Sequence, residues 1–182
     1  MIHLIYERET GVVVGHLDRD TLPPILNHHA TIAVPGLVDY QSVVIVDGAV
    51  VDLPPDLPDM RARRWRKVKA ARDAAEWSGC TTQLGRVDTD PDSQRKVSGS
   101  VQMAMIAQAA GVPFDLAWTM QDNRSVMHDA DAMIGMGVAV GRHVAACHAV
   151  ALAKRAVIDA ADTAEAIAAV DIEGGWPDAP IA

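Results

Sequence analysis

The residues of this chain best suited to binding a metal lie together near position 145. His143 and Cys147 are four residues apart and His148 follows directly, a spacing that places them on one side of a helix. A zinc site needs three or four ligands, and the sequence offers no second pair with a fitting spacing. Cys147 also falls on an apolar helical seam, where an unpaired cysteine packs as a small hydrophobic residue. We therefore expect packing at Cys147 and no bound metal.

Two further patterns would carry chemistry only in a different context. Ser125, His128 and Asp131 are the residue types of a catalytic triad, but they are close neighbours in sequence and no oxyanion-hole glycine motif surrounds them. The glycines of residues 135–141 resemble a nucleotide-binding loop, but they lie inside a predicted helix, where the backbone amides are already hydrogen-bonded. We expect no catalytic residue and no cofactor, and hence a protein that is not an enzyme.

A basic run is the strongest candidate for binding. Residues 61–72 hold seven of the sixteen cations of the chain, namely Arg61, Arg63, Arg64, Arg66, Lys67, Lys69 and Arg72. Such a helix could hold the phosphates of a nucleic acid. The net charge of −8 favours a salt-bridged or partner-binding surface instead. We predict that Arg61, Arg64 and Lys67 contact a protein partner.

The helix predicted over residues 91–110 has signals at both ends. Asp90 can cap its first turn, Pro91 suits its first position, and Gly111 can end it. Apolar residues lie on two nearly opposite faces, one of which includes Val97 and the other Ile106. Because a surface helix needs only one apolar face, this pattern predicts a helix buried between two layers.

The elements around this helix predict a mainly helical domain with a small sheet. Helical spacing indicates a helix over residues 59–78 and a long, glycine-containing helix over residues 129–158. Residues 80–87 are predicted as one strand, and residues 114–120 and 125–128 as a hairpin, together making a three-stranded sheet. Asp162 and Glu165 have the spacing of a capping box for a short last helix that ends near Val170.

The first 53 residues predict a small β meander. Residues 2–6 and 11–17 form one expected hairpin, and residues 41–46 and 49–53 form another around Asp47-Gly48, a strong turn signal. Between them, residues 22–29 follow two prolines and are predicted to form one helical turn. A piece of this size is marginal alone, so it should pack on a partner or on the rest of the chain.

The predicted fold class is α+β. A stiff Pro-rich segment at residues 54–58 separates the N-terminal β appendage, residues 1–53, from a helical domain at residues 59–177, and residues 178–182 form a tail. Of the 182 residues, 49% are hydrophobic and 22% charged, which is ordinary for a globular protein. The start lacks a signal-peptide pattern, and no apolar stretch approaches the ~20 residues of a membrane helix. We expect synthesis in the cytoplasm, two reduced cysteines and no membrane association.

The ordered elements from residue 61 to residue 177 resemble a phage-associated domain of unknown function, found as the C-terminal part of tail-fibre and tail-assembly proteins. The residues that carry the resemblance are Gly85, Thr89, Asp90, Ser93, Gln94, Gly99, Trp118, Asp129 and residues 172–177. The N-terminal region is similar in style to the short β segments that begin many such proteins. The chain departs from the pattern in its few aromatic residues and its Ala-rich long helix.

This resemblance implies a non-enzymatic bacteriophage tail protein, a fibre-attachment or baseplate-peripheral component located in the virion. Its partners would be other tail or fibre proteins, within a homo-oligomer or another symmetric assembly. One alternative is a tail-fibre assembly chaperone that is not retained in the virion; another is a nucleic-acid-binding regulator that uses the basic helix. An exposed β edge is a template for a partner strand, so we expect residues 1–53 to dock. The residues predicted to dock are Ile2, Leu4, Tyr6, Val43 and Ile45.

Overall fold

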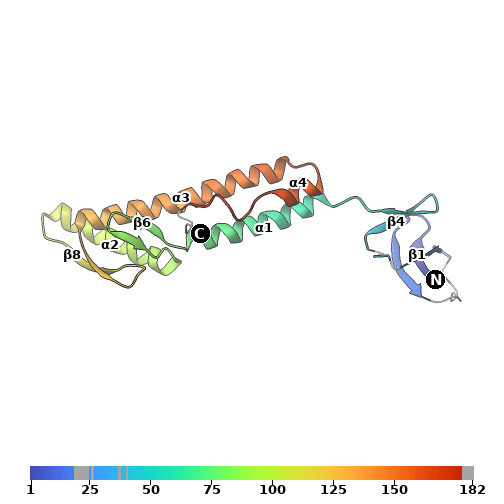
Figure 1. Ribbon diagram of the computed structural model, residues 1–182, viewed down its shortest axis with the longest axis horizontal. Coiled ribbons are helices and arrows are strands. Elements are labelled where there is room, and N and C mark those ends of the chain that lie inside the picture. Colours follow the sequence, from blue (N-terminus) through green and yellow to red (C-terminus); the bar gives the residue numbers. More distant parts are fainter. Residues whose placement is uncertain (19–24, 26, 37, 40, 178–182) are drawn as a thin grey trace. The chain divides into compact units, whose positions relative to one another are not determined.

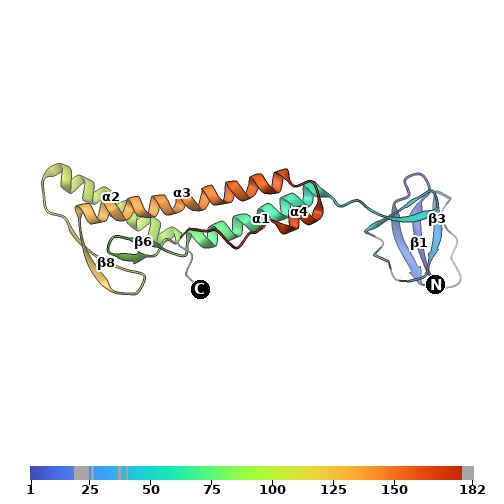
Figure 2. The same cartoon turned by 45° about the horizontal axis from the view of Figure 1, so that its top comes forward.

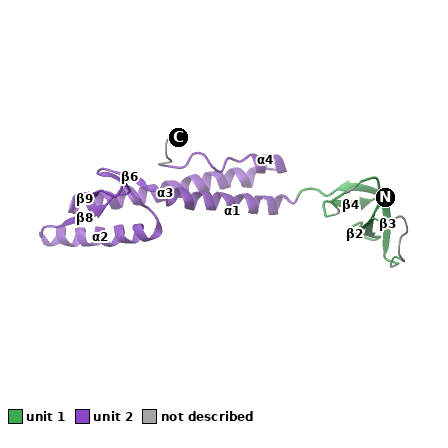
Figure 3. Ribbon diagram, turned by 60° about the horizontal axis from the view of Figure 1, so that its bottom comes forward, with its two compact units in different colours: residues 1–55 green, residues 56–182 purple. Residues whose placement is uncertain are grey.

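The structure is a computed structural model that describes residues 1–18, 25, 27–36, 38–39 and 41–177. It confirms an α+β fold and divides into two compact units, Met1–Pro55 (unit 1) and Asp56–Ala182 (unit 2) (Figure 3). The break between the units falls within the Pro-rich segment singled out in the sequence.

Unit 1 holds a three-stranded antiparallel sheet and a separate hairpin. The strands of the sheet are β1 (Ile2–Glu7), β2 (Val13–Asp18) and β3 (His29–Val34), in the order β2-β1-β3. The hairpin pairs β4 (Val43–Val46) with β5 (Ala49–Asp52), and its turn has the positive φ values expected of Asp47-Gly48. Both predicted hairpins are therefore confirmed.

The sequence analysis did not predict the third strand of the unit 1 sheet, β3. β3 pairs with β1 along its whole length, so β1 is the central strand and the sheet is not a simple meander. Of the helical turn predicted over residues 22–29, residues 22–24 and 26 lie outside the described residues, and His29 at its end begins β3 instead. The strand was missed because its pairing partner, β1, is distant in sequence.

Unit 2 is organised around its longest helix. It contains α1 (Leu57–Glu76), α2 (Pro91–Ala110), α3 (Ala130–Ala160) and α4 (Ala164–Ala169). Figures 1 and 2 show α2 and α1 following one another along α3. One hydrophobic cluster lies where α2, α3 and the strands meet, and a second joins α1, α3 and the C-terminal segment.

α2 has the ends that the sequence predicts, but not the predicted burial. Asp90 accepts hydrogen bonds from the backbone N–H groups of Asp92 and Ser93, and Gly111 ends the helix in the left-handed conformation. Val97 is buried in the cluster with α3, whereas Ile106 is 64% exposed. The prediction of a helix between two layers was wrong, because α3 and the hairpins cover one side of α2 and no described element covers the other.

The strands of unit 2 form two separate hairpins rather than the predicted three-stranded sheet. β6 (Cys80–Thr82) pairs with β7 (Gly85–Val87), because the chain reverses within residues 80–87, and β8 (Asp115–Thr119) pairs with β9 (Ser125–Asp129). The two hairpins are linked where the backbone N–H of Gln121 donates to the carbonyl of Arg86 at 3.0 Å. A single bond of this kind does not extend a sheet.

α3 is the core helix of unit 2. By length and composition it would suffice to cross a membrane, which corrects the expectation that no apolar stretch of the chain approaches that length. Here it packs along both α1 and α2. A side-chain carbon added at Gly137 would lie 2.6 Å from Val101 of α2, so close packing explains that glycine.

The C-terminal segment is fastened to α3. Thr163, rather than the predicted Asp162, caps α4, because its hydroxyl accepts from the N–H of Ala166. Beyond α4, Lys154 of α3 donates to the carbonyls of Asp171 and Gly174 at 2.8 and 2.7 Å. The Lys154 ammonium also lies 5.4 Å from the centre of the Trp176 ring, where a cation–π contact is favourable.

Candidate functional site

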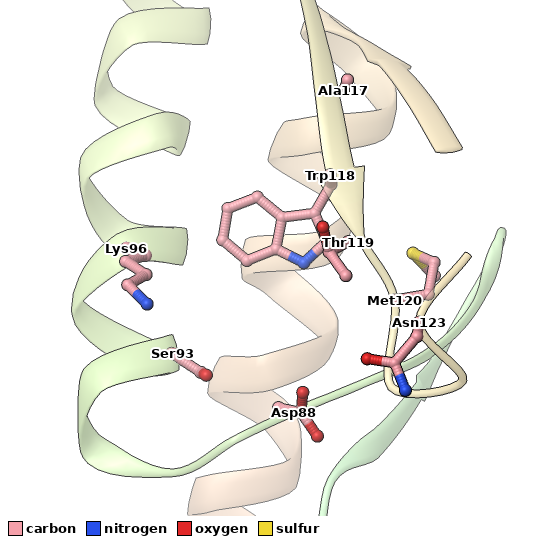
Figure 4. Close-up of a pocket in the computed structure, with 8 residues that line it drawn as sticks. All are labelled: Asp88, Ser93, Lys96, Ala117, Trp118, Thr119, Met120 and Asn123. Atoms are coloured by element: carbon pink, nitrogen blue, oxygen red, sulfur yellow. The ribbon is translucent and has the colours of Figure 1, made fainter. Parts of the chain in front are cut away.

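A half-open pocket of about 280 Å³ lies where the start of α2 faces the β8–β9 hairpin. Figure 4 shows the Trp118 ring extending from β8 toward α2, which carries Lys96. Asp88 lies on the loop that leads into α2, and Asn123 lies in the turn of the β8–β9 hairpin. Three chain segments meet here: the loop after β7, the first turns of α2, and the hairpin turn. The pocket lining combines charged and amide side chains with an aromatic ring.

The loop that carries Asp88 is held by its buried neighbour Thr89. The Thr89 hydroxyl accepts from the N–H of Gly79 at 2.9 Å and donates to the carbonyl of Glu76, the last residue of α1. The carbonyl of Thr89 accepts from the Gln94 side chain at 2.7 Å. Through its hydroxyl and its backbone carbonyl together, Thr89 thus joins the end of α1, the start of β6 and the start of α2, and fixes one wall of the pocket.

The first turn of α2 is held by Asp90. Its carboxylate accepts from the Ser93 hydroxyl as well as from backbone N–H groups, and these hydrogen bonds lower the pKa of Asp90, with a smaller contribution from the charge of Lys96. Asp90 is therefore charged at neutral pH, and Ser93 is oriented toward it. The opposite wall is as well defined, because the N–H of Met120 donates to the carbonyl of Arg124 at 2.8 Å and Asn123 occupies the left-handed turn position.

Four polar groups in this pocket have no hydrogen-bonding partner among the described residues. They are the Asp88 carboxylate, the Lys96 ammonium, the Asn123 carboxamide and the Trp118 indole N–H. Asp88, Lys96 and Asn123 are exposed and Trp118 is half-buried, so all four groups are accessible to a ligand, and we take the pocket as the candidate site. Sequence reasoning missed Asp88, Lys96 and Asn123, and the available signal was a tryptophan next to an Asn-containing turn.

The residues predicted to dock lie inside unit 1. Ile2, Leu4, Val43 and Ile45 are buried in its hydrophobic cluster, and Tyr6 packs against that cluster. Their side chains are covered by the unit itself, which corrects the prediction that they touch a partner. Because side chains alternate along a strand, these residues face inward and the residues next to them in sequence face outward.

The basic helix α1 divides into paired and solvent-facing cations. Arg61 donates to the carbonyl of Ala161 at the end of α3, and Arg64 donates to the carbonyl of Val170 at the end of α4. These two arginines cap the C-termini of helices, where a cation is favourable. Lys67 remains exposed, beside a small pocket that it shares with Arg63 and Ile167.

Of the residues considered for chemistry, the structure brings His143 and Cys147 together without a third ligand among the described residues. His143 and Cys147 are both buried, with 3.8 Å between Nε2 and Sγ, and the same Nε2 lies 3.2 Å from the carbonyl of Ala75. Asp131 accepts from Gln108, and His128 Nδ1 donates to the Val126 carbonyl. Within the described part of the chain, no three side chains of metal-binding type are grouped together.

A comparison with protein families gives one match, to the family described as "Domain of unknown function (DUF4376)", over residues 59–173. The chain belongs to the DUF4376 family. The match begins in the first turn of α1 and ends in the segment that is bonded to Lys154, so the DUF4376 region includes the helices and hairpins of unit 2. No curated protein and no solved structure matches the chain.

Proposed function

We propose that this DUF4376 protein is a non-enzymatic structural component of a bacteriophage tail that acts through contacts with other tail or fibre proteins. The observation that carries the proposal is the organisation of the chain into a small β unit and a helical DUF4376 unit, with the boundary between them in a Pro-rich segment. The ordered likeness to tail-associated proteins, from residue 61 to residue 177, supports the same assignment. In this proposal the protein is located in the virion, as one copy of a symmetric assembly.

Unit 1 is the proposed docking element, through its main chain and its outward-facing valines. β2 and β3 are the outer strands of the sheet, and no described strand pairs with the outer side of β3. Val14 on β2 and Val51 on β5 are 47% and 43% exposed. An unpaired edge offers backbone donors and acceptors to a strand of another protein, and exposed valines add apolar contact.

A chaperone that leaves the finished particle would have the same two units, and only its absence from virions distinguishes it. The nucleic-acid alternative loses support, because Arg61 and Arg64 are engaged by helix carbonyls and Arg63 pairs with Asp59. The exposed cations that remain on α1 are Arg66, Lys67 and Lys69. A shift of duplex DNA that weakens steeply with salt would restore that alternative.

The proposal is tested on particles of the phage that encodes the chain. Mass spectrometry of purified virions should find the protein at a constant ratio to other tail proteins, and its absence from virions that are otherwise complete would refute the structural role. For docking, Val14→Lys should reduce incorporation, because it places a charge at one of the exposed valines that are proposed to contact the partner. Val157→Lys, at an exposed position on α3, is the matched control. Equal incorporation of both variants, or of a chain lacking residues 1–53, would assign docking to the DUF4376 unit.

A further inference from the structure

We propose that the pocket between α2 and the β8–β9 hairpin binds a neutral hexose or N-acetylhexosamine unit, stacked on Trp118 and hydrogen-bonded by Asp88, Lys96 and Asn123. This inference is independent of the tail assignment, because it rests on the pocket alone. It gives the DUF4376 unit a ligand as well as protein contacts.

The unpaired groups of the pocket form a mixed set. Asp88 supplies only acceptors, Lys96 supplies only donors, and the Asn123 carboxamide supplies both. A sugar hydroxyl both donates and accepts, so adjacent hydroxyls can satisfy a carboxylate and an ammonium at the same time. Asp88, Lys96 and Asn123 are exposed, so a bond from each to the ligand replaces a bond to water and contributes modestly to affinity.

The charges of the pocket favour a neutral ligand. Asp88 and Lys96 carry opposite charges and line the same pocket, so a simple anion would meet the carboxylate and a simple cation would meet the ammonium (Figure 4). Ser93 is also close to an acidic group, because its hydroxyl donates to Asp90. A polyhydroxylated molecule without net charge is repelled neither by the carboxylate nor by the ammonium.

The aromatic wall supplies the rest of the recognition. The Trp118 ring is half-buried against the core of unit 2 and borders the open pocket (Figure 4). An aromatic face carries partial negative charge, which attracts the C–H groups on the apolar face of a sugar ring. The volume of about 280 Å³ suits one ring with part of it in solvent, rather than an enclosed molecule.

Little ordering is needed for binding. Thr89 and Asp90 fix the backbone beside Asp88 and Ser93, and the hairpin turn fixes Asn123 through the hydrogen bond from its N–H to the carbonyl of Met120 at 2.9 Å. A preorganised site pays less conformational entropy when the ligand arrives. A ligand of hexose size is therefore expected to bind with a Kd of about 1 mM.

The test is an NMR titration of the full chain. The protein has four tryptophans, and a Trp118→Phe variant identifies the indole N–H signal of Trp118 by its loss. Glucose, galactose, mannose and N-acetylglucosamine are added separately, to about 50 mM, well above the expected Kd. At least one of them should shift the Trp118 signal saturably and leave the signals of Trp65, Trp77 and Trp176 in place.

Two substitutions remove ligand contacts without straining the backbone. Asp88→Ala alters an exposed side chain, and Asn123→Gly suits the left-handed turn, so both variants should fold and bind about tenfold more weakly. Asp115→Ala, at an exposed aspartate of β8 outside the pocket, should bind like the parent. The proposal is overturned if no sugar shifts the Trp118 signal, or if both pocket variants bind as the parent does. It is equally overturned if glycine or phosphate, and not the sugars, produces the shift.

Discussion

Thr89→Val should destabilise the DUF4376 unit, because the Thr89 hydroxyl bonds both to the end of α1 and to the residue before β6. Valine has nearly the same shape, so the substitution removes the hydrogen bonds to Gly79 and Glu76 without leaving a cavity. Each lost bond costs about 1 kcal/mol, and a buried N–H left without a partner costs about 1–3 kcal/mol. Thr89 is fully buried, so we expect a total loss of about 2–4 kcal/mol in the free energy of unfolding.

Tryptophan fluorescence during urea unfolding measures this loss. All four tryptophans lie in unit 2, so the signal reports that unit and not the β unit. With a slope of about 2 kcal/mol per M urea, the midpoint should fall by about 1–2 M. Thr89→Ser is the matched control, because it keeps the hydroxyl and loses one methyl group, worth about 1 kcal/mol. If the valine variant is as stable as the serine variant, the three-element junction does not depend on this hydroxyl.

Three further predictions concern the same unit. Val97→Asp should unfold the unit or lower its melting temperature by far more than a few degrees, because the charge enters a buried cluster without a partner. Thermal melting followed by circular dichroism measures this, and a melting temperature near that of the parent would contradict it. Gly137→Ala should be less stable than Gly141→Ala by about 1–3 kcal/mol in urea, since the added methyl meets Val101 only at residue 137; equal stabilities would mean that the helices move apart freely. Hydrogen bonds lower the pKa of Asp90 and, through the N–H groups of Gly174 and Glu173, that of Asp171. The unfolded chain therefore binds protons more readily, so the stability that these groups contribute is retained above the usual aspartate pKa of about 3.9 and lost as the pH falls below it. Melting temperatures measured from pH 7 to pH 3 should fall only in that acid range. A fall between pH 7 and pH 5 would assign the loss to other groups.

The sequence by itself determined the features whose causes are local. The cap at Asp90, the end of α2 at Gly111 and the turn at Asp47-Gly48 each follow from the conformational preferences of a few adjacent residues. The α+β class was predictable for the same reason, since the spacing of apolar residues fixes the period of each element.

Only the tertiary structure decided which groups meet across long stretches of chain. Arg61 and Arg64 bond to carbonyls 100 and 106 residues away, which turns two predicted partner contacts into helix caps. β1 becomes the central strand of its sheet only through its pairing with the distant β3. The pocket likewise forms from three separate segments, because Asp88, Lys96 and Asn123 become neighbours only when α2 packs beside the hairpin. Sequence periodicity states that a helix has an apolar face, whereas the packing of the other elements decides which face is covered and which remains open to a partner or ligand.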